Sequence, residues 1–184
     1  KRGCRVNVKL HVGCGNVILP GWTNLDIDDI PGVDINDDAG VLSKIPDESC
    51  DIIYACHILE HFGRHEVGNV LKTWNKKLKN NGILRLAVPD FQKVIQWYQK
   101  NPELEDVTGL TVGGQKTKYD FHKVIFDKKK LTDLLTNSGF YDIREWDWRK
   151  TDHSNIDDYS QAYLPHMDKE NGLLMSLNIE AKKN

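Results

Sequence analysis

The chain has 184 residues, 39% of them hydrophobic, which is enough for one domain with a single buried core. Its 25 Lys and Arg residues nearly balance 27 Asp and Glu residues, and the formal net charge at pH 7 is -2. This balance argues against the strongly basic class of dedicated nucleic-acid binders. We therefore expect residues 1–184 to form one domain without a nucleic-acid partner.

The cysteines and the hydropathy pattern indicate the compartment. Cys4, Cys14, Cys50 and Cys56 form no C-x-x-C pair and no regular framework, so neither a disulfide scaffold nor a zinc ribbon is indicated. No apolar run approaches the length of a membrane span, and no charged-then-apolar start marks a secretory signal. We expect a cytoplasmic enzyme with no membrane partner, and the oligomeric state stays open.

The first third of the chain predicts closely spaced strands. Alternating apolar residues predict a strand over 6–12, which runs into a glycine turn at 13–15. Residues 24–28 and 50–55 have the composition of buried strands. Only four residues separate positions 28 and 33, whereas a crossover between parallel strands needs about a dozen. We therefore expect shortened first helices and a third strand that is short, displaced or absent.

The middle of the chain predicts an alternation of helices and strands. Apolar residues at helical spacing predict a helix over 66–78 with its stop at 81–82, followed by a strand over 83–88. Asp90 can cap a helix over 91–100. Strands that alternate with helices predict an open α/β sheet, mostly parallel, with ligands outside the carboxyl ends of its strands.

The last part combines regular and irregular stretches. Residues 101–118 have little periodicity and predict a lid or substrate loop. Asp127 can cap a helix that closes at Ser138-Gly139. Strands are predicted over 140–148 and 173–181, which would form a C-terminal antiparallel hairpin. The Asp-, His- and Tyr-rich stretch 149–171 between them is a second candidate substrate segment.

The segment ACHILEHF, residues 55–62, contains a possible metal motif. From His57 to His61 it matches H-x-x-E-H, in which two histidines one helical turn apart bind zinc and the glutamate serves as base. The alternative for His61 is to cap or pack against neighbouring backbone. Zinc would need a third ligand, for which the sequence offers His65, His122, His153 or an acid within 149–171.

Several motifs occur in an order typical of a known family. LHVGCG, NLDID, DDA, CDIIYACHILEHF and LKNNGILRLAVPD, within residues 8–90, together resemble the small class I S-adenosylmethionine-dependent methyltransferases. FHKVIF and SGFYDI extend the resemblance to about residue 146. The glycines are not the dinucleotide fingerprint, because a third glycine is missing. The resemblance implies a Rossmann-like sheet, S-adenosylmethionine as cofactor and S-adenosylhomocysteine as product.

The resemblance also implies the cofactor site. The turn at 13–15 would lie under the methionine part, Asp26 would hold the ribose, and Asp38 and Ala39 would meet the adenine. Because the resemblance places CHILEH at the methyl-transfer site, we expect no metal there. The expected cofactor-binding residues are His11, Gly13, Cys14, Gly15, Asp26, Ile27, Asp38, Ala39 and Cys56.

Methyl transfer from a sulfonium is an in-line displacement, so the protein aligns the reactants and removes a proton from a weakly acidic acceptor. Histidine suits this base role, and His57 and His122 are the catalytic candidates. Expected substrate-binding residues are His61, Tyr119, Asp120 and Lys123. Basic residues near the expected pocket wall, which indicate an anionic or sugar-like small-molecule acceptor, are Lys118, Lys123, Arg149 and His153.

The resemblance favours O-methylation of a sugar or phosphate-containing acceptor in surface polysaccharide biosynthesis. Two alternatives remain at the level of the sequence. The shortened first half is compatible with a non-catalytic binding module on the same fold, and the H-x-x-E-H motif is compatible with a metallohydrolase.

Overall fold

The computed structural model describes residues 8–184, so the first two residues of the predicted strand 6–12 lie outside the described part. The strands are β1 Lys9–Val12, β2 Thr23–Asp26, β3 Ile35–Asn36, β4 Cys50–Cys56, β5 Leu78–Pro89, β6 Phe140–Glu145, β7 Tyr163–Leu164, β8 Leu173–Leu174 and β9 Ser176–Lys183. The α-helices are α1 Val67–Lys77, α2 Phe91–Lys100, α3 Glu105–Val112 and α4 Lys128–Asn137. Three single turns of 3-10 helix are η1 Leu59–His61, η2 Trp148–Lys150 and η3 Tyr159–Gln161.

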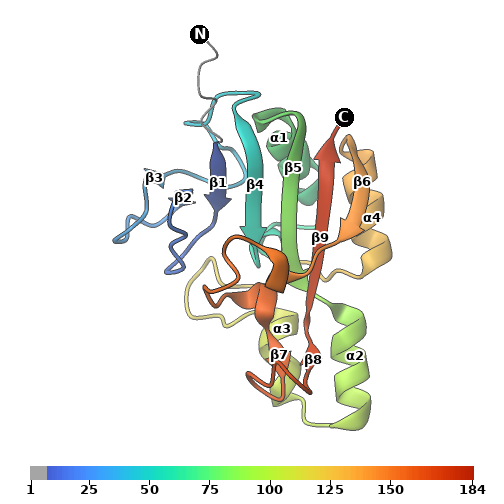
Figure 1. Ribbon diagram of the computed structural model, residues 1–184. Helices are drawn as coiled ribbons and strands as arrows, with labels where there is room; N and C mark the ends of the chain where they lie inside the picture. Colours follow the sequence, from blue (N-terminus) through green and yellow to red (C-terminus); the bar gives the residue numbers. More distant parts are fainter. Residues whose placement is uncertain (1–7) are drawn as a thin grey trace.

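Seven strands form one sheet in the order β3-β2-β1-β4-β5-β9-β6, and β7 pairs with β8 separately (Figure 1). The pairs from β3 to β5 are parallel, whereas β9 runs antiparallel to both β5 and β6. The order reverses between β1 and β4, so their carboxyl ends flank the usual ligand crevice of such sheets. The predicted Rossmann-like sheet with a C-terminal antiparallel hairpin is confirmed.

The first half is shortened as predicted. Among the described residues, the connections 13–22 and 27–34 contain no helix, and β3 has two residues. The side chain of Asn24 fixes the first connection, because its Oδ1 accepts a hydrogen bond from the Leu19 amide at 2.9 Å. A compact turn therefore replaces the helix that usually follows the first strand.

The helices with clear caps lie where they were predicted. Asp90 accepts a hydrogen bond from the Gln92 amide and caps α2, and Asp127 accepts one from the Lys130 amide and caps α4. α1 ends at Lys77, one residue before the predicted end at 78, and Leu78 is already extended and pairs with Cys50. β5 is therefore longer than predicted.

Three predictions about the later segments were wrong in part. Residues 101–118 are not a continuous loop, since they contain α3, a helix without a side-chain cap. β6 ends at Glu145, and Trp148 belongs to η2 instead. The predicted strand 173–181 is divided at Met175 into β8 and β9, because the Met175 amide bonds to the Ala162 carbonyl.

The two faces of the sheet have different cores. We call the face covered by α1 and α4 the helical face; its core is mostly aliphatic, with Leu71 and Trp74 fully buried. We call the opposite face, covered by residues 13–22 and 146–162, the loop face. Its cluster is formed by Leu19, Trp22 and Tyr54, with Val17, Ile52, Cys56, Trp146 and Ile156 packed against it.

A smaller apolar cluster joins α2 and α3 through Val94, Val107 and Met175. Figure 1 shows these helices with β7 and β8 beyond the carboxyl ends of β1, β4 and β5. These elements therefore lie at the end of the sheet where ligands are expected. No helix in the described part of the chain is long and apolar enough to cross a membrane.

Candidate active site

The glycine turn after β1 requires glycine for conformational and steric reasons. Gly13 has φ +63° and Gly15 has φ +51°, in the left-handed region that side chains disfavour. A Cβ on Gly13 would lie 2.6 Å from the Ile58 side chain, whereas a Cβ on Gly15 would meet nothing within 4 Å. Gly13 thus allows the loop after β4 to approach the end of β1.

Asp26 ends β2 with its carboxylate held in a fixed orientation. Its Oδ2 accepts a hydrogen bond from the Gly15 amide at 2.7 Å, and its Oδ1 accepts one from the Asp28 amide at 3.0 Å. The residue is 9% exposed. The carboxylate therefore links the glycine turn to the end of β2 while it lines a cavity.

The loop after β3 brings a second acidic residue to the same cavity. Asp38 Oδ1 accepts a hydrogen bond from the Gly40 amide at 2.7 Å, which closes a tight turn. The Ala39 carbonyl accepts a hydrogen bond from Trp74 Nε1 at 2.7 Å, so α1 positions this loop. The two residues predicted to meet the adenine, Asp38 and Ala39, thus lie in a turn held by hydrogen bonds, even though β3 is short.

A cavity of about 450 Å³ lies at the carboxyl ends of the strands. Eight of the predicted site residues line it: Gly13, Asp26, Ile27, Asp38, Ala39, His61, Tyr119 and Lys123. The other lining residues are Gly40, Val41, Ile58, Phe62, Glu66, Asn69, Val70 and Lys118. Of these eight, only Lys118 was singled out from sequence. The position of Val70 in the apolar pattern of α1 indicates core, so periodicity gave no sign of a cavity contact.

The structure places several predicted cofactor residues away from this cavity. His11 is buried on the loop face, with its ring stacked on Tyr54 at 5.2 Å and its Nδ1 3.2 Å from Asn24 Oδ1. Burial lowers the pKa of His11 to about 4. Burial raises the pKa of Cys14 to about 12 and raises that of Cys56 well above its usual value. These three residues, with Gly15, therefore support the site from beneath rather than line it.

Three residues that the sequence predicted near the methyl acceptor make contacts within the protein and do not reach the cavity. Asp120 Oδ2 accepts a hydrogen bond from the Lys116 amide at 3.2 Å, within the turn before His122. The Arg149 guanidinium lies over the Trp148 ring at 4.4 Å, and His153 is buried with its ring 4.6 Å from Tyr54. None of the three lines the 450 Å³ cavity.

The H-x-x-E-H segment is not the helix that the protease motif needs. His57 follows β4 directly with φ +50°, and residues 59–61 form the single turn η1. The prediction that His61 lies one helical turn beyond His57 was wrong, because the His57 amide bonds to the Ala87 carbonyl at 2.8 Å instead of starting a helix. The geometry gives no support to a zinc protease.

Both catalytic candidates lie behind the cavity lining, close to Glu60. His57 Nδ1 is 3.4 Å and His122 Nε2 is 3.9 Å from Glu60 Oε1. Burial, with repulsion from His122 and His61, lowers the pKa of His57 to about 3. Burial raises the pKa of Glu60 to about 8 and lowers the pKa of His122.

Segment 149–171 borders a second cavity, of about 440 Å³, together with α3. Asp158 and Tyr159 line it from one side, and Asp106 and Leu110 line it from the other. Tyr159 also stacks on the His57 ring at 5.3 Å. The second cavity thus reaches the residues behind the first one.

Comparison with known proteins identifies the domain. Residues 10–86 match the family model of a methyltransferase domain. This stretch runs from β1 into β5 and is the part of the chain that carries most of the motifs quoted above. Together with the solved structures below, the match supports the predicted S-adenosylmethionine-dependent methyltransferase and its cofactor. No curated protein has a sequence that matches this chain.

Solved structures share the fold over nearly the whole chain. A methyltransferase from Thermotoga maritima, described as a possible histamine N-methyltransferase, is 16% identical with a TM-score of 0.64, over 96% of this chain and 82% of that one. One from Methanosarcina mazei is 18% identical with a TM-score of 0.60, over 98% and 94%. One from Archaeoglobus fulgidus is 17% identical with a TM-score of 0.58, over 98% and 87%.

The residues of the cavity that Asp26 lines fit S-adenosylmethionine. The Asp26 carboxylate is pre-oriented by two backbone amides, and Gly13 lacks the Cβ that would narrow the approach to β1. A volume of about 450 Å³ lies within the range of roughly 300 to 1,000 Å³ usual for small-molecule sites. When bound, the cofactor supplies an electrophilic methyl group carried on a sulfonium.

Proposed function

We propose that the protein methylates an oxygen of a small polar acceptor that carries a sugar or a phosphate group. In this proposal Asp26 holds the ribose hydroxyls, Asp38 and Ala39 meet the adenine, and the turn at 13–15 receives the methionine part. The pre-oriented Asp26 carboxylate supports the ribose assignment, because a fixed acceptor loses little entropy when it binds two hydroxyl donors.

The side chains in the cavity wall are the observation that supports an anionic methyl acceptor. Lys118, Tyr119 and Lys123, from the segment between α3 and α4, line the same cavity as Asp26. The Lys123 amide donates a hydrogen bond to the Glu60 carbonyl at 2.8 Å, which fixes this segment against the loop after β4. Two ammonium groups and a phenol beside the cofactor residues suit a phosphate or carboxylate on the acceptor.

A neutral hydroxyl acceptor also requires proton removal. His57 and His122 are the candidates, and both have a lowered pKa, which favours the neutral imidazole. A pKa of about 3 makes His57 a weak base near neutral pH, so His122 is the better candidate of the two. Neither ring lines the cavity, so a proton would reach either one through an intermediate group or a local movement.

The biological setting belongs to the same proposal. Activated sugars and phosphate-bearing precursors of surface polysaccharides are small anionic molecules of the class that the two lysines suit. Cys14, Cys50 and Cys56 are free thiols, as in a reducing cytoplasm. A small-molecule acceptor, with no nucleic-acid or membrane partner, fits the balanced net charge of -2.

A panel assay tests the acceptor class. The protein is incubated with S-adenosylmethionine and phosphorylated sugars, nucleotide sugars, uronic acids, neutral sugars or amines, and S-adenosylhomocysteine formation is measured. We expect turnover with an anionic member. Replacement of Lys118 or Lys123 by Gln should raise the acceptor KM about fivefold, or about 1 kcal/mol, without changing cofactor affinity.

Lys116→Gln is the matched control, since Lys116 is exposed in the same segment and does not line the cavity. Turnover confined to neutral sugars or amines would contradict the acceptor class. So would equal effects of the Lys116, Lys118 and Lys123 variants on KM.

A further inference from the structure

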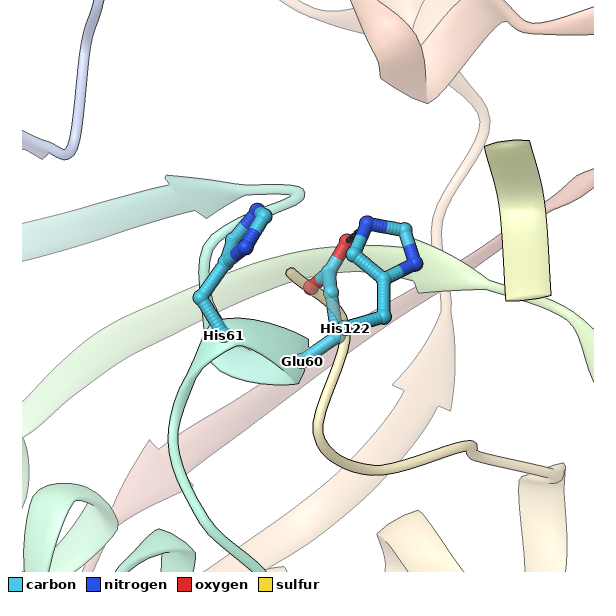
Figure 2. Close-up of side chains that lie close together, drawn as sticks. All are labelled: Glu60, His61 and His122. Atoms are coloured by element: carbon cyan, nitrogen blue, oxygen red, sulfur yellow. Dashed lines mark ion pairs between the residues drawn. The ribbon is translucent and has the colours of Figure 1, made fainter. Parts of the chain in front are cut away.

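Glu60 is a buried carboxylate that lacks hydrogen-bond donors. The residue is 0% exposed, and neither oxygen accepts a hydrogen bond from the described part of the chain. Figure 2 shows the rings of His61 and His122 close to it. One ligand atom from each of Glu60, His61 and His122 lies within 4.8 Å of the others. An unpaired carboxylate in such a place is costly unless a proton or a cation balances it.

The hydrogen bonds of two histidines fix which nitrogen is free. His61 Nδ1 lies 3.2 Å from the Phe121 carbonyl oxygen, and His122 Nδ1 lies 3.1 Å from the Leu110 carbonyl oxygen. A carbonyl oxygen only accepts, so each Nδ1 carries the proton and each Nε2 keeps its lone pair. Metal-binding histidines typically donate their other ring N–H to a carbonyl in this way.

His57 presents a third lone pair to the same carboxylate. Asn178 Nδ2 donates to the Ser160 carbonyl at 2.9 Å, so Asn178 Oδ1 accepts the hydroxyl proton of Ser176 at 2.9 Å. The Ser176 oxygen is then the acceptor for His57 Nε2–H at 3.2 Å. His57 Nδ1 therefore faces Glu60 Oε1 at 3.4 Å with a lone pair, and two acceptor atoms oppose each other in a buried place.

We propose that Glu60, His61 and His122 form a binding site for a divalent transition-metal ion, with Zn²⁺ the first ion to test. Two imidazoles and one carboxylate are a ligand set that suits Zn²⁺ and related ions and leaves coordination positions open. His61 lines the 450 Å³ cavity, so an open position faces that cavity. His57 Nδ1 faces the same carboxylate but is not part of this trio.

This site differs from the zinc motif that the sequence contains. The motif assigns His57 and His61 as ligands and Glu60 as base, and the sequence favoured no metal at all. Among the third-ligand candidates that the sequence offered, the fold brings His122 to this place, and the Glu60 carboxylate takes the role of a ligand. Ligand atoms on a tetrahedral Zn²⁺ lie about 3.4 Å apart, so the trio must close inward by about 1 Å.

A bound ion would join two walls of the cavity. Glu60 and His61 belong to the loop after β4, and His122 belongs to the segment that carries Tyr119 and Lys123. If the proposed acceptor class holds, an acceptor oxygen could occupy the open position, where the ion would lower the pKa of a hydroxyl. The ion would then replace His122 as the group that promotes proton loss, because a ligated Nε2 has no free lone pair. That last point rests on the proposed function, whereas ion binding itself does not.

Calorimetric titration of the chelator-treated full chain with ZnCl₂ tests the site without any acceptor or cofactor. We expect one equivalent to bind, and we expect Glu60→Gln and His122→Gln each to weaken binding at least about 100-fold, since outer-shell losses alone cost 10- to 100-fold. His65→Gln, at an exposed position outside the trio, should change affinity by less than about twofold.

The rival occupant is a proton shared by Glu60 and His57. In that case Zn²⁺ does not bind stoichiometrically, or it binds equally to the wild type and to Glu60→Gln, and either result overturns the proposal. Because the buried variants can unfold, His61→Gln at a half-buried position provides a second test. Co²⁺ should give the visible absorption of a low-coordinate site in the wild type; persistence of that spectrum in a folded His61→Gln variant would also overturn the proposal.

Discussion

The helical face and the loop face of the sheet are built in different ways. On the helical face, α1 and α4 place regularly spaced apolar side chains on an aliphatic core. On the loop face, two irregular segments cover the sheet with aromatic and imidazole rings. Tyr54 bonds to Asp158, 104 residues away, and His153 packs against Tyr54 and Trp22. One face of this sheet is therefore stabilised mainly by close packing of aliphatic side chains. The other is stabilised by ring contacts and hydrogen bonds between residues far apart in the sequence.

Leu71→Ala should give the largest effect, because the helical face depends on packed volume. Leu71 is fully buried in α1, and its truncation leaves a cavity beside the sheet. We expect the free energy of unfolding to fall by about 4 kcal/mol in urea denaturation. Leu104→Ala, at a 66% exposed position, should change it by less than about 0.5 kcal/mol. Similar losses at both positions would contradict the account of this face.

The loop face should instead be sensitive to acid through His11. Burial lowers its pKa from 6.5 to about 4, so between these values the unfolded chain binds a proton that the folded chain excludes. The free energy of unfolding therefore falls as the pH drops through this window, by about 3 kcal/mol in total from this residue. His11→Phe keeps a ring against Tyr54 and should remove that part of the pH dependence. If the free energy of unfolding of His11→Phe changes with pH between 4 and 6.5 as steeply as that of the wild type, this role of His11 is wrong.

Tyr54→Phe tests the hydrogen bonding of the loop face, and its expected effect on the free energy of unfolding is smaller. The Tyr54 hydroxyl donates to Asp158 Oδ2 at 2.6 Å from a fully buried side chain to a half-buried one, and the loss of this bond should cost about 2 kcal/mol. Tyr141→Phe removes a similar bond, to Asn81 Oδ1 at 2.7 Å, but on the exposed surface. Its cost should be below about 0.5 kcal/mol. Equal costs would mean that burial does not strengthen the loop-face bond.

The contrast between local and long-range interactions also explains how much of the fold could be predicted from the sequence. α2 and α4 follow from local signals, namely a capping Asp and apolar spacing. α3 could not be predicted in this way, because it has no capping side chain and contains Thr and Gly at its centre. The contact of Tyr54 with Asp158 spans too much sequence for any local pattern to reveal.

In the candidate site too, local sequence motifs predicted some residues, whereas other contacts form only in the folded chain. Gly13, Asp26, Asp38 and Ala39 line the cavity as the order of motifs predicted, because each lies at or just beyond a strand end whose place the sheet topology fixes. The H-x-x-E-H pattern predicted a helix that does not form. Its glutamate meets His122, which lies outside the pattern, and only the folded chain brings the two together.

The central claim is that Asp26 and the glycine turn hold S-adenosylmethionine. Calorimetric titration of the wild type, Asp26→Ala and Asp28→Ala with S-adenosylhomocysteine tests it most directly. Asp28 is the matched control, because its exposed carboxylate lies two residues away outside the cavity lining. We expect Asp26→Ala to weaken binding on the order of 100-fold, or about 3 kcal/mol, and Asp28→Ala to change it less than about twofold. Equal affinity of wild type and Asp26→Ala, or no binding to folded wild type, would contradict the account.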